Sequence, residues 1–235
     1  MNRRIALFKK PGLTNYSKKV LGVSRANLLV YFPLNGNALD YSGNGFNGVV
    51  SNVIYGAGIG DGGKAAIFAG TGYINFFSAA FAAVFNGAEG TVSVWQCVSA
   101  AGDWSDSAYR DVLIINKDAN NMIQLTKGSA ANRYTFDRIA AATAEARNQA
   151  IGPSTAMFHT AMTWSEAADQ VIYYLAGTPL ETDTTLGAWG TAVAVRALIG
   201  ASTTTPGSTW KGNIAHFGLW NTPLLGTQIA SLAVV

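Results

Sequence analysis

The sequence has little of what builds cross-linked, metal-bound or highly charged proteins. Cys97 is the only cysteine, so no intrachain disulfide or thiolate metal cluster can form. Only 12% of residues are charged against 49% hydrophobic, which excludes a disordered chain and leaves ample material for a core. No apolar run approaches the roughly 18 residues that a membrane span needs, so we expect no membrane insertion.

Acidic residues are also missing from the first 25 positions, although these hold seven Lys or Arg. We therefore predict that residues 1–27 form a basic arm, irregular in itself, which docks on a partner. The same charge would suit nucleic acid or an anionic membrane, and a solvated tail is the plainest alternative. The start of the chain lacks the apolar core of a signal peptide, so we do not expect general secretion. The predicted docking residues are Arg3, Arg4, Lys9, Lys10, Lys18 and Lys19.

From Leu28 onward, short apolar segments alternate with clusters of Gly, Asn, Asp and Ser, a pattern typical of many strands joined by turns. We predict one all-β domain over residues 28–235, since a single sandwich commonly reaches this length. The strand candidates are residues 28–34, 65–68, 73–76, 91–98, 111–116, 122–126, 133–139, 156–164, 170–175, 196–200 and 212–220.

Helical patterns are confined to three short segments. Residues 78–85 and the C-terminal residues 223–232 are predicted to be helices, the second beginning at Pro223 behind a capping Thr222. The alanine-rich residues 140–150 could form either a helix or a strand, because alanine favours helices while the surrounding pattern favours strands.

Seven segments, in order, carry a family resemblance. They are residues 29–48 with an Asp-x-Ser-Gly-Asn turn at Asp40, the Gly-rich hairpin 63–76, and segments 91–95, 158–164, 171–177, 198–200 and 210–221. Together they resemble the laminin G-like domains of the concanavalin A-like lectin/glucanase superfamily. The resemblance implies a two-sheet antiparallel jelly-roll sandwich with a short C-terminal helix.

The resemblance also guides the search for catalytic and metal-binding residues. Glycoside hydrolases of this superfamily place paired acids on one strand, and the sequence has no Glu-x-Asp-x-x-Glu pattern, so we predict no enzymatic activity. His159 and His216 lie on predicted strands without a nucleophile motif, so we expect hydrogen-bonded sheet residues. We predict no cofactor; Asp40 is the one candidate ligand for a weak Ca²⁺ site.

Carbohydrate-binding proteins use aromatic faces beside polar groups, so tryptophans that the family pattern does not require are candidate contacts. Trp104 and Trp189 fall in predicted loops outside the pattern. We predict that they contact a glycan or protein partner, or that each closes one end of the sandwich. The predicted contact residues are Trp104, Asp106, Tyr109, Arg110 and Trp189, with Asp103 nearby.

These features favour a binding protein without catalysis. The leading hypothesis is a phage virion component, on the capsid or tail, that docks on other virion subunits through residues 1–27 and displays a lectin-like sandwich. The alternative is a free or cell-surface lectin or adhesin that binds a glycan outside the cell. A glycoside hydrolase is the third hypothesis, and a homo-oligomer is left open.

Overall fold

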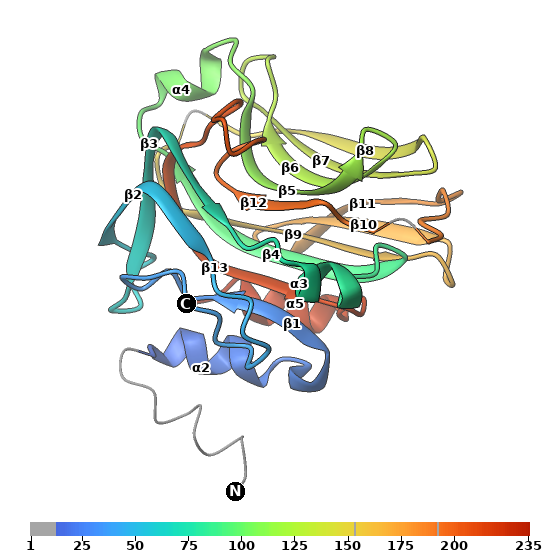
Figure 1. The fold of residues 1–235 in the computed structure, drawn as a ribbon. Coiled ribbons are helices and arrows are strands. Elements are labelled where there is room, and N and C mark those ends of the chain that lie inside the picture. Colours follow the sequence, from blue (N-terminus) through green and yellow to red (C-terminus); the bar gives the residue numbers. More distant parts are fainter. Residues whose placement is uncertain (1–12, 153, 192) are drawn as a thin grey trace, which may run out of the picture.

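The computed structural model describes residues 13–152, 154–191 and 193–235, which form two packed β-layers (Figure 1). The strands are β1 (Leu28–Phe32), β2 (Val49–Ala57), β3 (Lys64–Asn75), β4 (Glu89–Val98), β5 (Arg110–Asp118), β6 (Asn121–Lys127), β7 (Arg133–Ala140), β8 (Thr143–Ala150), β9 (Phe158–Ser165), β10 (Gln170–Leu175), β11 (Thr178–Asp183), β12 (Arg196–Ile199) and β13 (Lys211–Trp220). The helical segments are α2 (Asn15–Gly22), η1 (Arg25–Asn27), α3 (Ala79–Val84), α4 (Gly102–Ser105) and α5 (Gly226–Leu232).

All strand pairs are antiparallel, and the predicted two-sheet sandwich is confirmed. The first sheet has the order β11, β10, β9, β4, β13, with β1 beside the second half of β13. The second has the order β3, β12, β5, β6, β7, β8. The long strand β3 belongs to both sheets, because it pairs with β13 over its first half and with β12 at its end.

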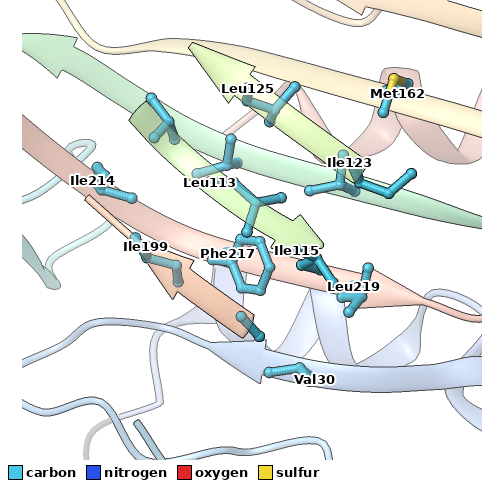
Figure 2. Close-up of a cluster of buried hydrophobic side chains, with 14 of the residues drawn as sticks. Val30, Leu113, Ile115, Ile123, Leu125, Met162, Ile199, Ile214, Phe217 and Leu219 are labelled. Carbon is cyan, nitrogen blue, oxygen red and sulfur yellow. The ribbon is translucent and has the colours of Figure 1, made fainter. Parts of the chain in front are cut away.

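The main hydrophobic core lies between the two sheets. Alternate residues of β5 and β6 point inward, as the period of two in a strand requires. Figure 2 shows them facing side chains of the first sheet, and the labelled residues of this contact are Leu113, Ile115, Ile123, Leu125, Met162, Ile214, Phe217 and Leu219.

A second apolar cluster covers the other face of the first sheet, beneath α2 and α5. Tyr16 of α2 accepts a hydrogen bond from Trp95 Nε1 at 2.9 Å and donates one to Leu232 O of α5. Trp220 Nε1 donates to Val23 O at 3.0 Å, just after α2. The sandwich therefore has a third, helical layer on this face.

The expectation that residues 1–27 are irregular is wrong for residues 13–27, which include a helix. Thr14 Oγ1 accepts a hydrogen bond from Ser17 N at 3.0 Å and begins α2. Tyr16, Val20 and Leu21 form one apolar face of the helix and are buried on the sandwich. Arg3, Arg4, Lys9 and Lys10 lie outside the described residues, and docking by the arm remains a prediction.

Three other expectations are settled by the structure. The alanine-rich residues form β8, because Ala141 and Ala142 adopt the left-handed turn that joins β7 to β8. The helix predicted at residues 78–85 is confirmed as α3. The C-terminal helix is also confirmed, but it begins at Gly226 rather than Pro223, since Leu225 occupies its N-cap position. None of the described helices is long and apolar enough to span a membrane.

Candidate functional site

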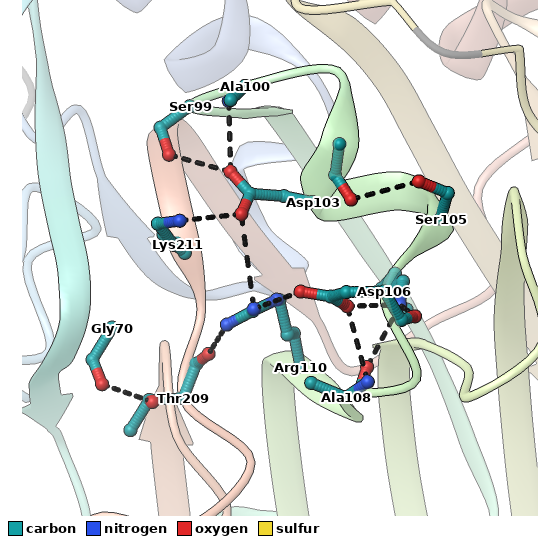
Figure 3. A network of polar contacts seen from close by, with 12 residues as sticks. Gly70, Ser99, Ala100, Asp103, Ser105, Asp106, Ala108, Arg110, Thr209 and Lys211 are labelled. Atoms are coloured by element: carbon teal, nitrogen blue, oxygen red, sulfur yellow. Dashed lines mark hydrogen bonds and ion pairs between the residues drawn. The ribbon is translucent and has the colours of Figure 1, made fainter.

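A charged network lies at the rim of the sandwich, where residues 99–109 connect β4 to β5 (Figure 3). Asp103 accepts hydrogen bonds from Ser99 Oγ and Ala100 N at 2.9 Å each, and from Lys211 Nζ at 2.7 Å. Burial opposes the charge on Asp103, but these hydrogen bonds outweigh it and lower the pKa of the carboxyl group. The network ties the loop to β13.

Asp106 binds two cations at the other end of the same network. It pairs with Arg110, and its Oδ1 lies 2.7 Å from Nζ of the fully buried Lys127. Desolvation opposes ionisation here too, yet Lys127 and Arg110 lower the pKa of Asp106 to about 2. Because Asp106 and Arg110 form an ion pair with each other, their charges are less available to a partner than predicted. Tyr109 is 55% exposed and remains a candidate contact.

The expectation that Trp104 presents an exposed ring is wrong. Its side chain is fully buried, its Nε1 donates to Ser154 O at 2.8 Å, and its ring packs edge-on against Trp210. Trp104 therefore closes one end of the sandwich, which is the alternative that the sequence left open.

Trp189 is buried in the same way. It packs edge-on against Phe85, and its ring covers Gly87 so closely that a Cβ there would lie 2.0 Å from a ring atom. The absence of a side chain at Gly87 makes room for the indole, so Trp189 too is a core residue rather than an exposed contact.

Asp40 organises the turn that follows β1. One carboxylate oxygen accepts hydrogen bonds from Tyr31 N and Ser42 N, at 3.0 and 2.8 Å. The other accepts from Ser42 Oγ, Gly45 N and Phe46 N, at 2.7 to 3.1 Å. These donors occupy the lone pairs that Ca²⁺ would need, so Asp40 does not fit the metal role considered for it. No group of three or more His, Cys, Asp or Glu among residues 13–152, 154–191 and 193–235 could hold a metal ion.

Both histidines are hydrogen-bonded sheet residues, as predicted. His159 Nε2 lies 2.8 Å from Ser93 Oγ, and burial lowers the pKa of the imidazole to about 3. His216 Nδ1 lies 2.8 Å from Tyr31 Oη, and its Nε2 lies 3.1 Å from Asp61 Oδ2. Neither imidazole is exposed.

A further polar surface, which the sequence analysis did not identify, is the outer face of the second sheet. Figure 1 shows that the strands of this sheet are curved. Ile114 and Leu198, which lie opposite each other, are buried there although they point away from the core. We call this surface the concave face, and its outward residues include Asn75, Asp111, Ile114, Asn116, Gln124, Asp137, Arg196 and Leu198.

Two acceptor oxygens on the concave face have no hydrogen-bond donor in the described part of the chain. They are Asp111 Oδ2 and Asn116 Oδ1, and both residues are at most 9% exposed. Gln124 Nε2 donates to the other oxygen of Asp111 at 2.7 Å, and the Thr126 hydroxyl, which donates to Arg110 O, also lies close enough to Asp111 to lower the pKa of its carboxyl group. Buried acceptors without donors are uncommon and costly, so this surface is a candidate binding site.

Electrostatics also distinguish the concave face from the rim network. Burial raises the pKa of Asp111 to about 6, and the nearby Asp137 carboxylate adds to the rise. Burial likewise raises the pKa of Asp137 to about 6, against the opposing charge of Arg133. Carboxyl groups with strongly perturbed pKa values are enriched at functional sites.

Comparisons with known proteins agree with this architecture. A family model described as the concanavalin A-like lectin/glucanases superfamily (Laminin_G_3) matches residues 68–230, so the chain belongs to this family. No curated protein matches the sequence.

Several solved structures share the fold. Domain 4 of AbnA, an extracellular arabinanase from Geobacillus stearothermophilus solved with arabinotriose, is similar at a TM-score of 0.68 and 18% identity, over 88% of this chain and 98% of that one. The binding domain of Paraclostridial Mosquitocidal Protein 1 has a TM-score of 0.67 at 12% identity, over 89% and 52%. The receptor-binding domain of botulinum neurotoxin mosaic serotype C/D has a TM-score of 0.69 at 11% identity, over 89% and 51%. The chain thus spans about half of these two toxin domains.

Proposed function

We propose that this domain binds a glycan on its concave face and carries out no catalysis. The observation that carries the proposal is the set of neighbouring polar groups on this face, in which the fully buried Asp111 accepts a hydrogen bond from Gln124 Nε2, and Gln124 lies opposite Asp137. Sugars present many hydroxyl donors, which the oxygens of Gln124 and Asp137 can accept. Both of these residues are half-buried on the same face.

The similar structures support a binding role. The arabinanase domain was solved with a bound arabinotriose, and the neurotoxin and mosquitocidal protein structures are of binding domains. At 11 to 18% identity they share only the fold with this chain, so the glycan specificity proposed here depends on the concave face itself.

The absence of catalysis is part of the proposal. A glycosidase needs one carboxyl group as acid and another as base or nucleophile, both in contact with the substrate. Asp111 has a raised pKa but is fully buried and hydrogen-bonded to Gln124, which suits a supporting role better than contact with a reacting bond.

A glycan array, followed by calorimetry with the best glycan, tests the proposal. We expect Gln124→Ala to weaken binding at least tenfold, because it removes a hydrogen-bonding group from the concave face. The matched control is Gln149→Ala on β8, where Gln149 lies opposite the buried Tyr134 and so faces the other side of the sheet.

Two results would contradict parts of this proposal. Loss of binding in Tyr109→Ala but not in Gln124→Ala would move the site to the rim network. Release of new reducing ends from the bound glycan would establish a hydrolase.

We also propose that the protein is a phage virion component anchored by its basic N-terminal residues, with a free or cell-surface lectin as the alternative. The support is the cluster of basic residues in the first 25 positions, which contain no Asp or Glu. Replacing Arg3, Arg4, Lys9 and Lys10 with Gln should reduce incorporation into purified particles, as measured by immunoblotting, while the fold and glycan binding are retained. Full incorporation of this variant, or absence of the wild-type protein from particles, would contradict the anchoring role.

A further inference from the structure

Three polar side chains form a row across the concave face, one from each of three neighbouring strands. Asp111 lies on β5, Gln124 on β6 and Asp137 on β7, and Gln124 is directly opposite Asp137 in the register. Gln124 Nε2 donates to Asp111 Oδ1 at 2.7 Å. Gln124 is therefore hydrogen-bonded to Asp111 on one side and is one strand spacing, about 4.8 Å, from Asp137 on the other.

No cation pairs directly with either carboxyl group within the described residues. Arg110 and Lys127, at the ends of β5 and β6, both pair with Asp106. Arg196 on β12 donates to Ser202 O at 2.9 Å, and Lys117 at the far end of β5 is exposed. Arg133 on β7 is the nearest opposing charge to Asp137, and the loop at Ser208 contributes only a backbone oxygen to Asp111 N.

The ionisation state of Asp111 fixes the orientation of the Gln124 amide. A carboxylate only accepts hydrogen bonds, so an ionised Asp111 requires the Gln124 NH₂ to face it and leaves the amide oxygen directed away. A protonated Asp111 can instead donate to the Gln124 oxygen, which turns the amide and presents its NH₂ group. Protonation of Asp111 therefore changes the group that Gln124 presents to a ligand from a hydrogen-bond acceptor to a hydrogen-bond donor.

We propose that the Asp111–Gln124–Asp137 row binds hydroxyl donors of a glycan only while its carboxyl groups are ionised, and that proton uptake by the row releases the glycan. This inference rests on the proposed glycan-binding function. At neutral pH the row presents the Gln124 oxygen and the Asp137 carboxylate, and binding displaces any proton into solvent. In acid the row presents an amide NH₂ and a neutral carboxyl group, to which the same hydroxyls are poorly matched.

The transition falls in a physiological range because burial raises the pKa of both carboxyl groups to about 6. The two groups interact, so they titrate as a pair across the region around pH 6. If the glycan binds only the ionised form, a pKa of about 6 leaves about one tenth of the protein able to bind at pH 5.0, but nearly all of it at pH 7.5. The expected loss between pH 7.5 and pH 5.0 is therefore about tenfold.

The test combines binding with a direct view of the amide. The wild-type protein, Asp111→Asn, Asp137→Asn and the control Asp118→Asn, at an exposed turn, are applied to one glycan array at pH 7.5 and 5.0. The Gln124 side-chain NH₂ signals are followed by NMR across the same pH range without glycan. We expect binding by the wild type and Asp118→Asn to fall about tenfold at pH 5.0, with the Gln124 signals shifting near pH 6.

The Asp111→Asn variant should bind weakly at both pH values and abolish this shift, because the introduced amide can donate to Gln124 at any pH. Equal glycan binding by the wild type at both pH values, or Gln124 signals that do not titrate, would overturn the inference but leave the proposed function standing. Absence of glycan binding at either pH would overturn the proposed function and the inference with it.

Discussion

At the scale of single residues, the ionised form of Asp111 on the concave face lowers the free energy of unfolding, and this loss can be measured. The pKa of Asp111 is raised to about 6, so the folded protein holds this proton more tightly than the unfolded chain does. The contribution of Asp111 to the free energy of unfolding is therefore most favourable below about pH 4. It falls as the pH rises toward about 6 and stays reduced above that value.

Replacing Asp111 with Asn should remove this cost, since an amide cannot ionise and can still hydrogen-bond to Gln124. We expect the free energy of unfolding to rise by about 1–3 kcal/mol at pH 7.5 and to change little at pH 4. Urea denaturation at the two pH values measures it. Asp118→Asn serves as the control, and a loss of stability in Asp111→Asn at pH 7.5 would show that the charged form is stabilising.

The sequence identifies individual residues of this site only in part. Asp111 and Asp137 both lie in predicted strands, where a carboxylate among apolar residues is a usable signal. Their placement on one face could not be predicted, because it depends on the irregular pairing of β5 with β6 between Asp111 and Leu113. Trp104 shows the opposite error: a loop position suggested exposure, but the loop folds back and buries the ring.

At the scale of elements, periodicity predicts the strands that carry a buried face and misses those that do not. The inner strands β4, β9 and β13 are mostly buried and lie where the sequence predicts them. The edge strands β2 and β11 have exposed or half-buried residues throughout, so no apolar pattern marks them.

Helix α2 was missed for a different reason. Its apolar face consists of only Tyr16, Val20 and Leu21, which is too short a pattern to stand out beside the basic residues. Its stability comes from tertiary packing on the sandwich rather than from its own sequence, as is usual for a helix of this length.

At the scale of the whole molecule, α2 defines where the folded domain begins. The helix packs against Trp95 and Trp220 of the first sheet. The hydroxyl group of Tyr16 connects α2 to β4 and α5 through hydrogen bonds. Lys19 Nζ adds a hydrogen bond to Val234 O at 2.6 Å, so the two ends of the described chain are held together. The folded domain therefore includes α2 and begins before the expected boundary at Leu28.

Truncation tests whether α2 is part of the folded domain. Removal of residues 1–22 should lower the free energy of unfolding by about 5 kcal/mol, since each buried apolar side chain of α2 contributes about 1.5–3 kcal/mol. Such a loss is a large part of the stability of a typical domain, so the shorter chain could fail to fold. Tyr16→Phe gives a graded measurement in the full chain, with an expected loss of about 1–2 kcal/mol from the missing hydrogen bonds. If removal of residues 1–22 leaves the midpoint unchanged, the sandwich is complete without α2, and the helix belongs to the docking arm after all.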